Sequence, residues 1–517
     1  MELVKKQIRR NQMGKSIISQ FVMDNDYNVP DVKKDICRII TEEGKILVDE
    51  VRPMEQYVRV KGRLEFQVLY AVDEGEPTMD ALNGQIPFEE MIYVEEKDVP
   101  YVLRDTKVEM SIAMIHSRKI NMKAMVEMEI SSEIEMADAL TEDVETEKDL
   151  FKKKQKITLL KLCTSKKDIY RIKEEMQLPG TKETIGSLLW ADVSTRKTDT
   201  KLAEGELIIT GELLVFCFYE SPDGKLDWVE QVVPYEGCVE CQGADVHMYH
   251  YVNHRLTDVC TDIRADEDGE LRSIGIEGTL EMRIAVYEEE QMELLSDVYS
   301  LSEKYDIETE CITYEEPLLQ NHSKCKLTER LVLPELKDDI LQICHSNGMV
   351  QVDSTQITND GIQIEGVLHI NFLYVKADDK VPFGVWKGMI PFSHLVAAGE
   401  TVSNMKYDIT SALEQLSVSL LGGDSVEVKA VLAFHSFLRN RREALNIVEM
   451  HEGPYPDEEK KRPGIVGYQV KDGDDLWSLA KRYRTTIKGI CDANDLKEET
   501  LKTGQRILIL KENVSIL

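Results

Sequence analysis

The segment GRLEFQVLY (Gly62–Tyr70) decides the fold, because it returns later in the chain as GELLVFCFY (Gly211–Tyr219) and GVLHINFLY (Gly366–Tyr374). In each copy the tyrosine lies eight residues after the glycine. An apolar residue followed by proline precedes each glycine by 32 residues, and a proline followed by an aromatic residue comes after it. These anchors are Val29-Pro30, Leu178-Pro179 and Leu333-Pro334, then Pro87-Phe88, Pro234-Tyr235 and Pro391-Phe392. A spacing kept three times predicts a tandem array of one domain type.

The alternation inside this segment predicts a β-strand with one apolar face. That face carries Leu64, Phe66, Val68 and Tyr70 in the first copy. The opposite face is polar in the first and third copies but apolar in the second, which predicts a strand buried on both faces there. The glycine predicts a β-bulge or a close backbone approach. Helical periodicity is weak, and short helices are expected only at 29–40 and after Pro179 and Pro334.

Composition limits the classes of partner. The 517 residues hold 63 Lys and Arg against 95 Asp and Glu, a net charge of −32, which disfavours nucleic acid and anionic membranes as partners. No run of 18 apolar residues exists, so no membrane span is expected. The first residues are charged with no apolar stretch after them, and the ten cysteines show no paired spacing. We therefore expect reduced thiols and a cytoplasmic protein.

The predicted fold class is multi-domain and mostly β. Three tandem β-rich repeats, with sandwich or barrel-like sheets, are expected at 15–145, 160–305 and 325–450. The joints between them, 141–156 and roughly 303–329, are charged and lack a core pattern. A charged, Pro-rich linker at 451–465 is expected to act as a semi-rigid spacer before a small α+β module at 466–511.

The last module resembles a LysM domain. It reads VGYQVKDGDDLWSLAKRYRTTIKGICDANDLKEETLKTGQRILIL, and the resemblance rests on Tyr468, Val470, Gly473, Asp474, Leu476, Trp477, Leu479, Ala480, Tyr483, Asn494, Leu496, Gly504, Gln505, Ile507 and Ile509. It implies a βααβ fold whose groove binds N-acetylglucosamine chains or, in some intracellular members, a protein. The groove would comprise Gly473, Asp474, Asp475, Leu476, Trp477, Asn494, Asp495 and Leu496.

Three of these groove residues have a second interpretation. Asp475 stands where the family usually has Thr, and it still suits the N-cap of the first helix. Trp477 is one position off the apolar stripe of that helix, so it is either ordinary core or a contact at the groove rim. Asn494 is either a helix stop or a ligand contact.

A cysteine and histidine cluster offers a metal site as a further alternative. Cys238 and Cys241 are followed by His247 and His250, but the spacing is short and irregular for zinc. The positions that match the two cysteines in the other copies are apolar: Met91 and Val94, then Leu395 and Ala398. We predict buried free thiols, no metal and no cofactor. No catalytic constellation is found, so no enzyme is expected.

The order of three β-rich repeats, a charged linker and a LysM domain resembles the SipL/SpoVID-type spore coat morphogenetic proteins, which join SPOCS domains to a C-terminal LysM domain. The resemblance implies a non-enzymatic scaffold in the mother-cell cytoplasm, at the forespore surface. Its LysM domain would dock to the coat ATPase SpoIVA, and the repeats would link SpoIVA to other coat proteins. Tandem copies suit a scaffold because they turn weak contacts into avidity. The alternative is a peptidoglycan-binding, cell-wall-associated protein, which needs an export route.

Overall fold

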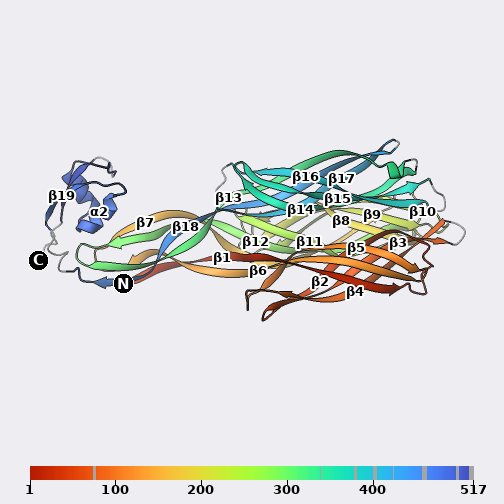
Figure 1. Cartoon of the computed structure of the whole chain (residues 1–517), viewed down its shortest axis with the longest axis horizontal. Coiled ribbons are helices and arrows are strands. Elements are labelled where there is room, and N and C mark those ends of the chain that lie inside the picture. Colours follow the sequence, from red (N-terminus) through yellow and green to blue (C-terminus); the bar gives the residue numbers. More distant parts are fainter. Residues whose placement is uncertain are drawn as a thin grey trace.

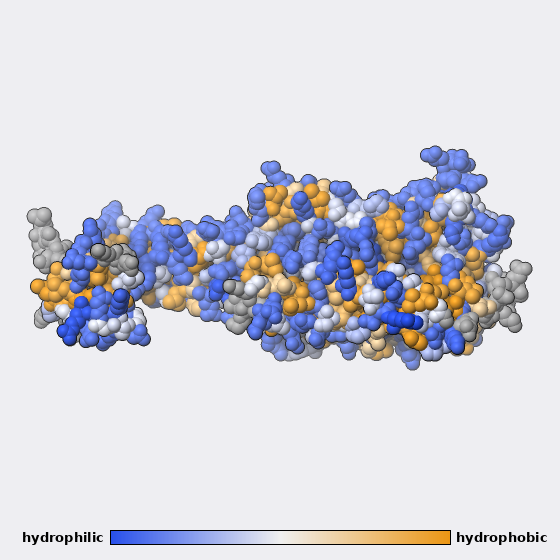
Figure 2. Space-filling view, turned by 90° about the horizontal axis from the view of Figure 1, so that it is seen from above, coloured by the Kyte–Doolittle hydropathy of each residue, from blue (hydrophilic) through white to orange (hydrophobic). Residues whose placement is uncertain are grey.

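The computed structural model describes residues 1–73, 77–337, 339–377, 381–399, 404–422, 424–456, 463–496 and 500–511. The molecule is elongated: a wide β body narrows into a stalk, and a small helical module lies beyond the end of the stalk (Figure 1). Within the described residues, no helix has the length and hydropathy needed to cross a bilayer. Hydrophilic residues cover most of the visible surface, with apolar patches between them (Figure 2).

Six strands repeat three times along the chain, and we call each set a unit. Unit 1 has β1 (Glu2–Asn28), β2 (Arg38–Met54), β3 (Tyr57–Asp73), β4 (Pro77–Tyr93), β5 (Tyr101–His116) and β6 (Lys119–Glu145). Unit 2 has β7 (Phe151–Gln177), β8 (Ser187–Ala203), β9 (Glu206–Glu220), β10 (Leu226–Glu240), β11 (Tyr249–Ala265) and β12 (Leu271–Tyr299). Unit 3 has β13 (Lys304–Val332), the 3₁₀ turn η1 (Pro334–Leu336), β14 (Ile340–Thr358), β15 (Gly361–Lys376), β16 (Phe383–Ala397), β17 (Met405–Gly422) and β18 (Ser425–Gly453). The domain boundaries given above stay predictions.

Each unit is a sandwich of two three-stranded antiparallel sheets. The sheet orders are β2-β3-β4 with β1-β6-β5, β10-β9-β8 with β11-β12-β7, and β14-β15-β16 with β13-β18-β17. One apolar core per unit lies between its two sheets. The predicted apolar face of β3 supplies Leu64, Phe66, Val68 and Tyr70, all at most 3% exposed. The β-rich sandwich prediction is confirmed.

The repeated glycine allows a close approach between strands. Gly366 pairs across β15 and β16 with Phe392, and a Cβ at Gly366 would lie 2.8 Å from that ring and 2.1 Å from the backbone oxygen of Gln351. In the same way, Gly62 pairs with Phe88 and Gly211 pairs with Tyr235, the aromatic residues that follow Pro87 and Pro234. The other neighbouring strand has a register shift opposite or next to each glycine. Both predicted features are therefore present, with the bulge on the adjacent strand.

The strand predicted to be buried on both faces lies where the three units meet. Phe216 and Phe218 of β9 are fully buried, on the face opposite the core of unit 2. They belong to an apolar cluster that includes Leu69 from unit 1 and Leu373 and Phe383 from unit 3. The three units therefore share a core and form one continuous body.

The stalk is built from the longest strands of all three units. It comprises 2–13, 133–145, 151–163, 287–299, 304–316 and 440–453, and each unit contributes one antiparallel two-stranded ribbon. Leu140 of unit 1, Leu159 of unit 2 and Ile312 of unit 3 are among the residues that form its shared core. The prediction that the joints at 141–156 and 303–329 lack a core was therefore wrong. Each ribbon is too thin to have a core of its own, and other units cover its apolar side chains.

The expectation of short helices after the first anchors was wrong in units 1 and 2. Between β1 and β2 the chain turns without forming a helix, because the Arg118 guanidinium donates hydrogen bonds to the carbonyls of Val29, Pro30 and Lys33 at 2.6–3.2 Å. Arg272 does the same for two carbonyls in unit 2. Only unit 3 has the short turn η1 at this place among the described residues.

Candidate docking site on the C-terminal module

The C-terminal module folds as β19 (Ile465–Gln469), α2 (Leu476–Tyr483), α3 (Ile487–Ala493) and β20 (Arg506–Leu510), with β19 and β20 antiparallel. Its core includes Leu476, Leu479 and Ala480 of α2. The Asp475 carboxylate accepts a hydrogen bond from the Ser478 N–H at 2.8 Å and caps α2, as predicted. The predicted βααβ fold is confirmed. Of the predicted linker and module, residues 457–462 and 497–499 lie outside the described residues.

The loop after β19 is braced from within. Gly473 has a φ of +85°, a conformation that favours glycine. The Asp474 carboxylate accepts hydrogen bonds from the Lys471 N–H at 2.7 Å and from the Tyr468 hydroxyl at 2.9 Å. These two bonds lower the pKa of Asp474. Asp474 is therefore a charged brace that fixes the loop in front of α2.

The loop before β20 is held by Asn494. Its side-chain N–H groups donate to the Ile490 carbonyl at 2.8 Å and the Leu508 carbonyl at 2.7 Å, and its Oδ1 accepts from the Leu508 N–H at 2.6 Å. The amide thus joins α3 to β20. Asp495 is exposed with a φ of +51°, and Leu496 is half-buried. On this side of the predicted groove, Asp495 and Leu496 are the residues that offer surface.

Trp477 contacts the end of the stalk, which neither of its two interpretations foresaw. Its indole N–H donates to Asp297 Oδ2 at 2.7 Å, and its ring packs edge-on against Tyr299 with centroids 4.9 Å apart. The ammonium group of Lys481, one turn later on α2, lies 2.5 Å from the other oxygen of Asp297. The Asp297 carboxylate of β12 therefore binds two side chains of α2.

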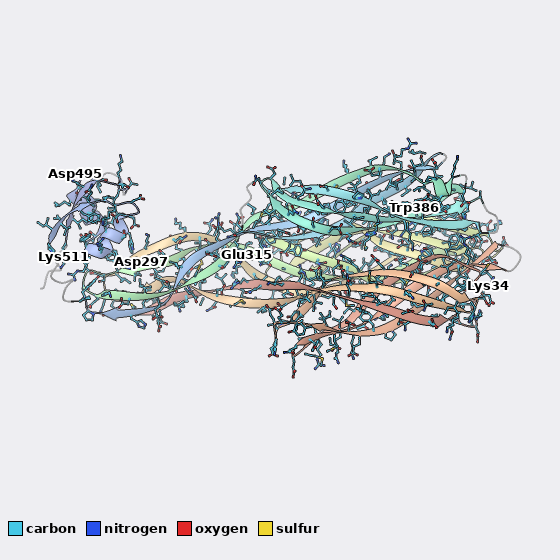
Figure 3. All side chains as sticks on the ribbon, viewed as in Figure 1. Lys34, Asp297, Glu315, Trp386, Asp495 and Lys511 are labelled. Carbon is cyan, nitrogen blue, oxygen red and sulfur yellow. The ribbon has the colours of Figure 1, made fainter. Side chains whose placement is uncertain are left out.

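Further contacts complete this interface, which we call the latch; it comprises Lys153, Asp297 and Tyr299 of the stalk and Asp475, Trp477 and Lys481 of the module. Lys153 of β7 pairs with Asp475 at 3.0 Å. The Tyr299 hydroxyl donates to the Thr485 carbonyl at 3.0 Å. Figure 3 shows Asp297 where the stalk meets the module and Asp495 on the outer side of the module. The latch therefore engages Asp475 and Trp477 in one half of the predicted groove, and the half with Asp495 faces outward.

The cysteine prediction is corrected in one respect. Cys241 is buried as predicted, but Cys238 is exposed, because it faces outward from β10 at the sheet surface. Within the described residues, sets of three side chains close enough to hold a metal occur at Asp199, His322 and His435 and on the stalk at Glu308, Glu449 and His451. The predicted absence of a metal stays a prediction.

Comparison with known families identifies the repeats. A sequence profile described as the SipL, SPOCS domain matches residues 35–142, 184–264 and 339–421, more than half of the chain, with one match in each unit. The chain belongs to the SipL SPOCS-domain family. A LysM domain profile matches residues 468–510. Comparisons with curated proteins and with solved structures gave no match. The architecture is that of the SipL/SpoVID-type proteins, and the protein is a coat-associated sporulation protein built from binding and scaffold domains.

Proposed function

We propose that this protein is a non-enzymatic spore coat scaffold. Its LysM module docks to the coat ATPase SpoIVA at the forespore surface, in the mother-cell cytoplasm, and the SPOCS body links SpoIVA to other coat proteins. The observation that carries this proposal is the separation of the two binding parts. The module lies beyond the end of a stalk made by all three units, away from the body (Figure 1). Such a molecule can contact one layer with its head and another with its body.

The latch supports a protein, rather than a glycan, as the partner of the module. The half of the groove with Asp475 and Trp477 already binds a protein surface, through a lysine, a carboxylate and an aromatic ring. An aromatic anchor beside charge-assisted hydrogen bonds is typical of protein–protein contacts. The second candidate function is peptidoglycan binding, which the LysM match itself favours.

The test compares both ligands on the full chain. Biolayer interferometry with purified SpoIVA is run with and without soluble peptidoglycan fragments, and sedimentation with intact peptidoglycan is run in parallel. Leu496→Ala changes the outward half of the groove, and Lys488→Ala changes an exposed residue of α3 as the matched control. We expect SpoIVA binding that Leu496→Ala weakens, that Lys488→Ala leaves unchanged, and that glycan does not displace. Cosedimentation with peptidoglycan and no binding to SpoIVA would refute the proposal.

A further inference from the structure

A cavity of about 230 Å³ lies where the three units meet, lined by residues from all of them. One of these residues, Arg439, is bonded to Glu315, which Figure 3 labels where the stalk joins the body. The lining includes Lys167, which is exposed, so the cavity reaches solvent. Its volume is several times the roughly 30 Å³ that a water molecule occupies in the liquid. It has room for a small molecule.

The charge of this cavity is opposite to that of the chain. Six Lys and Arg side chains line it, against the two carboxylates of Glu133 and Asp408, in a protein with a net charge of −32. Three of the six are arginines, one from each unit: Arg104 of β5, Arg283 of β12 and Arg439 of β18. A concave wall of low dielectric strengthens the field of such a cluster.

The carboxylates nearby neutralise only part of this charge. Arg283 pairs with Glu133, and Arg439 pairs with Asp408 and with Glu315. Two of the lysines are also paired, Lys406 with Glu315 and Lys166 with Asp168. Among the described residues, Arg104 has no hydrogen-bond or ion-pair partner. Burial, and further the charge of Arg104, lowers the pKa of Arg283, which indicates that the two guanidinium groups repel each other. The cavity therefore holds cationic charge that no protein group balances.

Unused hydrogen-bonding groups lie at the same place. The Arg439 side chain is only 4% exposed, yet its Nε–H, a donor, is buried with no partner among the described residues. Buried polar atoms are nearly always bonded in folded proteins, so a group left over calls for a ligand or a water. Tyr251 also lines the cavity, and burial raises the pKa of its hydroxyl, which stays a protonated donor.

We propose that this cavity binds a small anion with two or more negatively charged oxyanion groups, a polycarboxylate or an oligophosphate, between Arg104, Arg283 and Arg439. Planar guanidinium groups bind carboxylate and phosphate oxygens in pairs, and the donor of Tyr251 adds a fourth contact. A monovalent ion leaves part of the remaining cationic charge unbalanced, whereas a compact polyanion reaches all three units at once. Its binding therefore stabilises the assembled body.

The test is isothermal titration calorimetry on the full chain in low-salt buffer, with pyrophosphate and citrate titrated separately and orthophosphate as the weaker reference. We expect saturable binding of one pyrophosphate or one citrate per chain, tighter than orthophosphate. Whichever of the two binds identifies the oxyanion class. The absence of saturable binding of both probes at millimolar concentration would overturn the proposal.

Arg104→Gln supplies the decisive variant, with Arg171→Gln at an exposed arginine of β7 as the matched control. Losing one charge-assisted contact of about 1.4 kcal/mol lowers affinity about tenfold, and the control leaves it unchanged. Without ligand, Arg104→Gln should melt at the wild-type temperature or above it, since removing the charge relieves the repulsion of Arg283. Wild-type affinity in Arg104→Gln would refute the site, and so would a melting temperature below that of the ligand-free wild type.

Discussion

The latch predicts that Asp297→Ala releases the LysM module from the stalk. The change removes the acceptor of the Trp477 indole and the partner of Lys481. A hydrogen bond to a charged group contributes about 1.5–3 kcal/mol, and an ion pair of this exposure (26% for Asp297, 37% for Lys481) contributes at most about 1 kcal/mol. Both α2 groups can bond to water once free, so we take the low end, about 1.5–2 kcal/mol. The ratio of latched to released module should fall about ten- to thirtyfold.

The indole N–H resonance of Trp477 reports the release of the module from the stalk directly. It is simple to resolve, because the chain has only four tryptophans. In the nitrogen-labelled full chain, Asp297→Ala should move one indole N–H signal upfield and speed its exchange with water. Asp306→Ala is the matched control, since Asp306 is an exposed carboxylate on the stalk that pairs only with Lys304 among the described residues. An unshifted Trp477 signal in Asp297→Ala would show that the module does not rest on the stalk. If the proposed partner also uses Trp477, its affinity should rise by up to the same factor.

Three further predictions concern pH, packing and docking. Burial lowers the pKa of His345. Hydrogen bonds to two carboxylates outweigh this effect and raise that pKa from its ordinary 6.5 to about 9. Its stabilising contribution is complete below pH 6.5 and is lost as the pH rises to 9, so wild type should lose urea stability over that window and His345→Gln should not. Gly366→Ala should lower the free energy of unfolding by about 2 kcal/mol or more, measured by urea titration, whereas Gly180→Ala, with open space around it, should have little effect. Trp477→Ala should release the module from the stalk, as Asp297→Ala does, while circular dichroism shows the module still folded; a melted module would make Trp477 a core residue instead.

The sequence predicted the features that depend on neighbouring residues. The face of β3 and the double burial of β9 follow from alternation, and the Asp475 cap follows from local spacing. The stalk was missed because its apolar residues, such as Leu140 and Ile312, are covered by ribbons from other units, far away in sequence. The latch was missed for the same reason, because nothing around Asp297 marks it as the acceptor for a tryptophan 180 residues later.

A buried polar contact sets the alignment of two of the three similar ribbons in the stalk. Apolar contacts alone would tolerate several registers, because the ribbons are alike in length and pattern. The fully buried Asn446 of unit 3 removes that freedom: its Oδ1 accepts from the Thr141 N–H at 2.9 Å, and its Nδ2 donates to the Ala139 carbonyl at 3.0 Å, both in unit 1. Any other register leaves these polar groups buried without partners, at a cost of about 1–3 kcal/mol each. One asparagine thus fixes the alignment of unit 1 with unit 3, and with it the end of the stalk on which the LysM module rests.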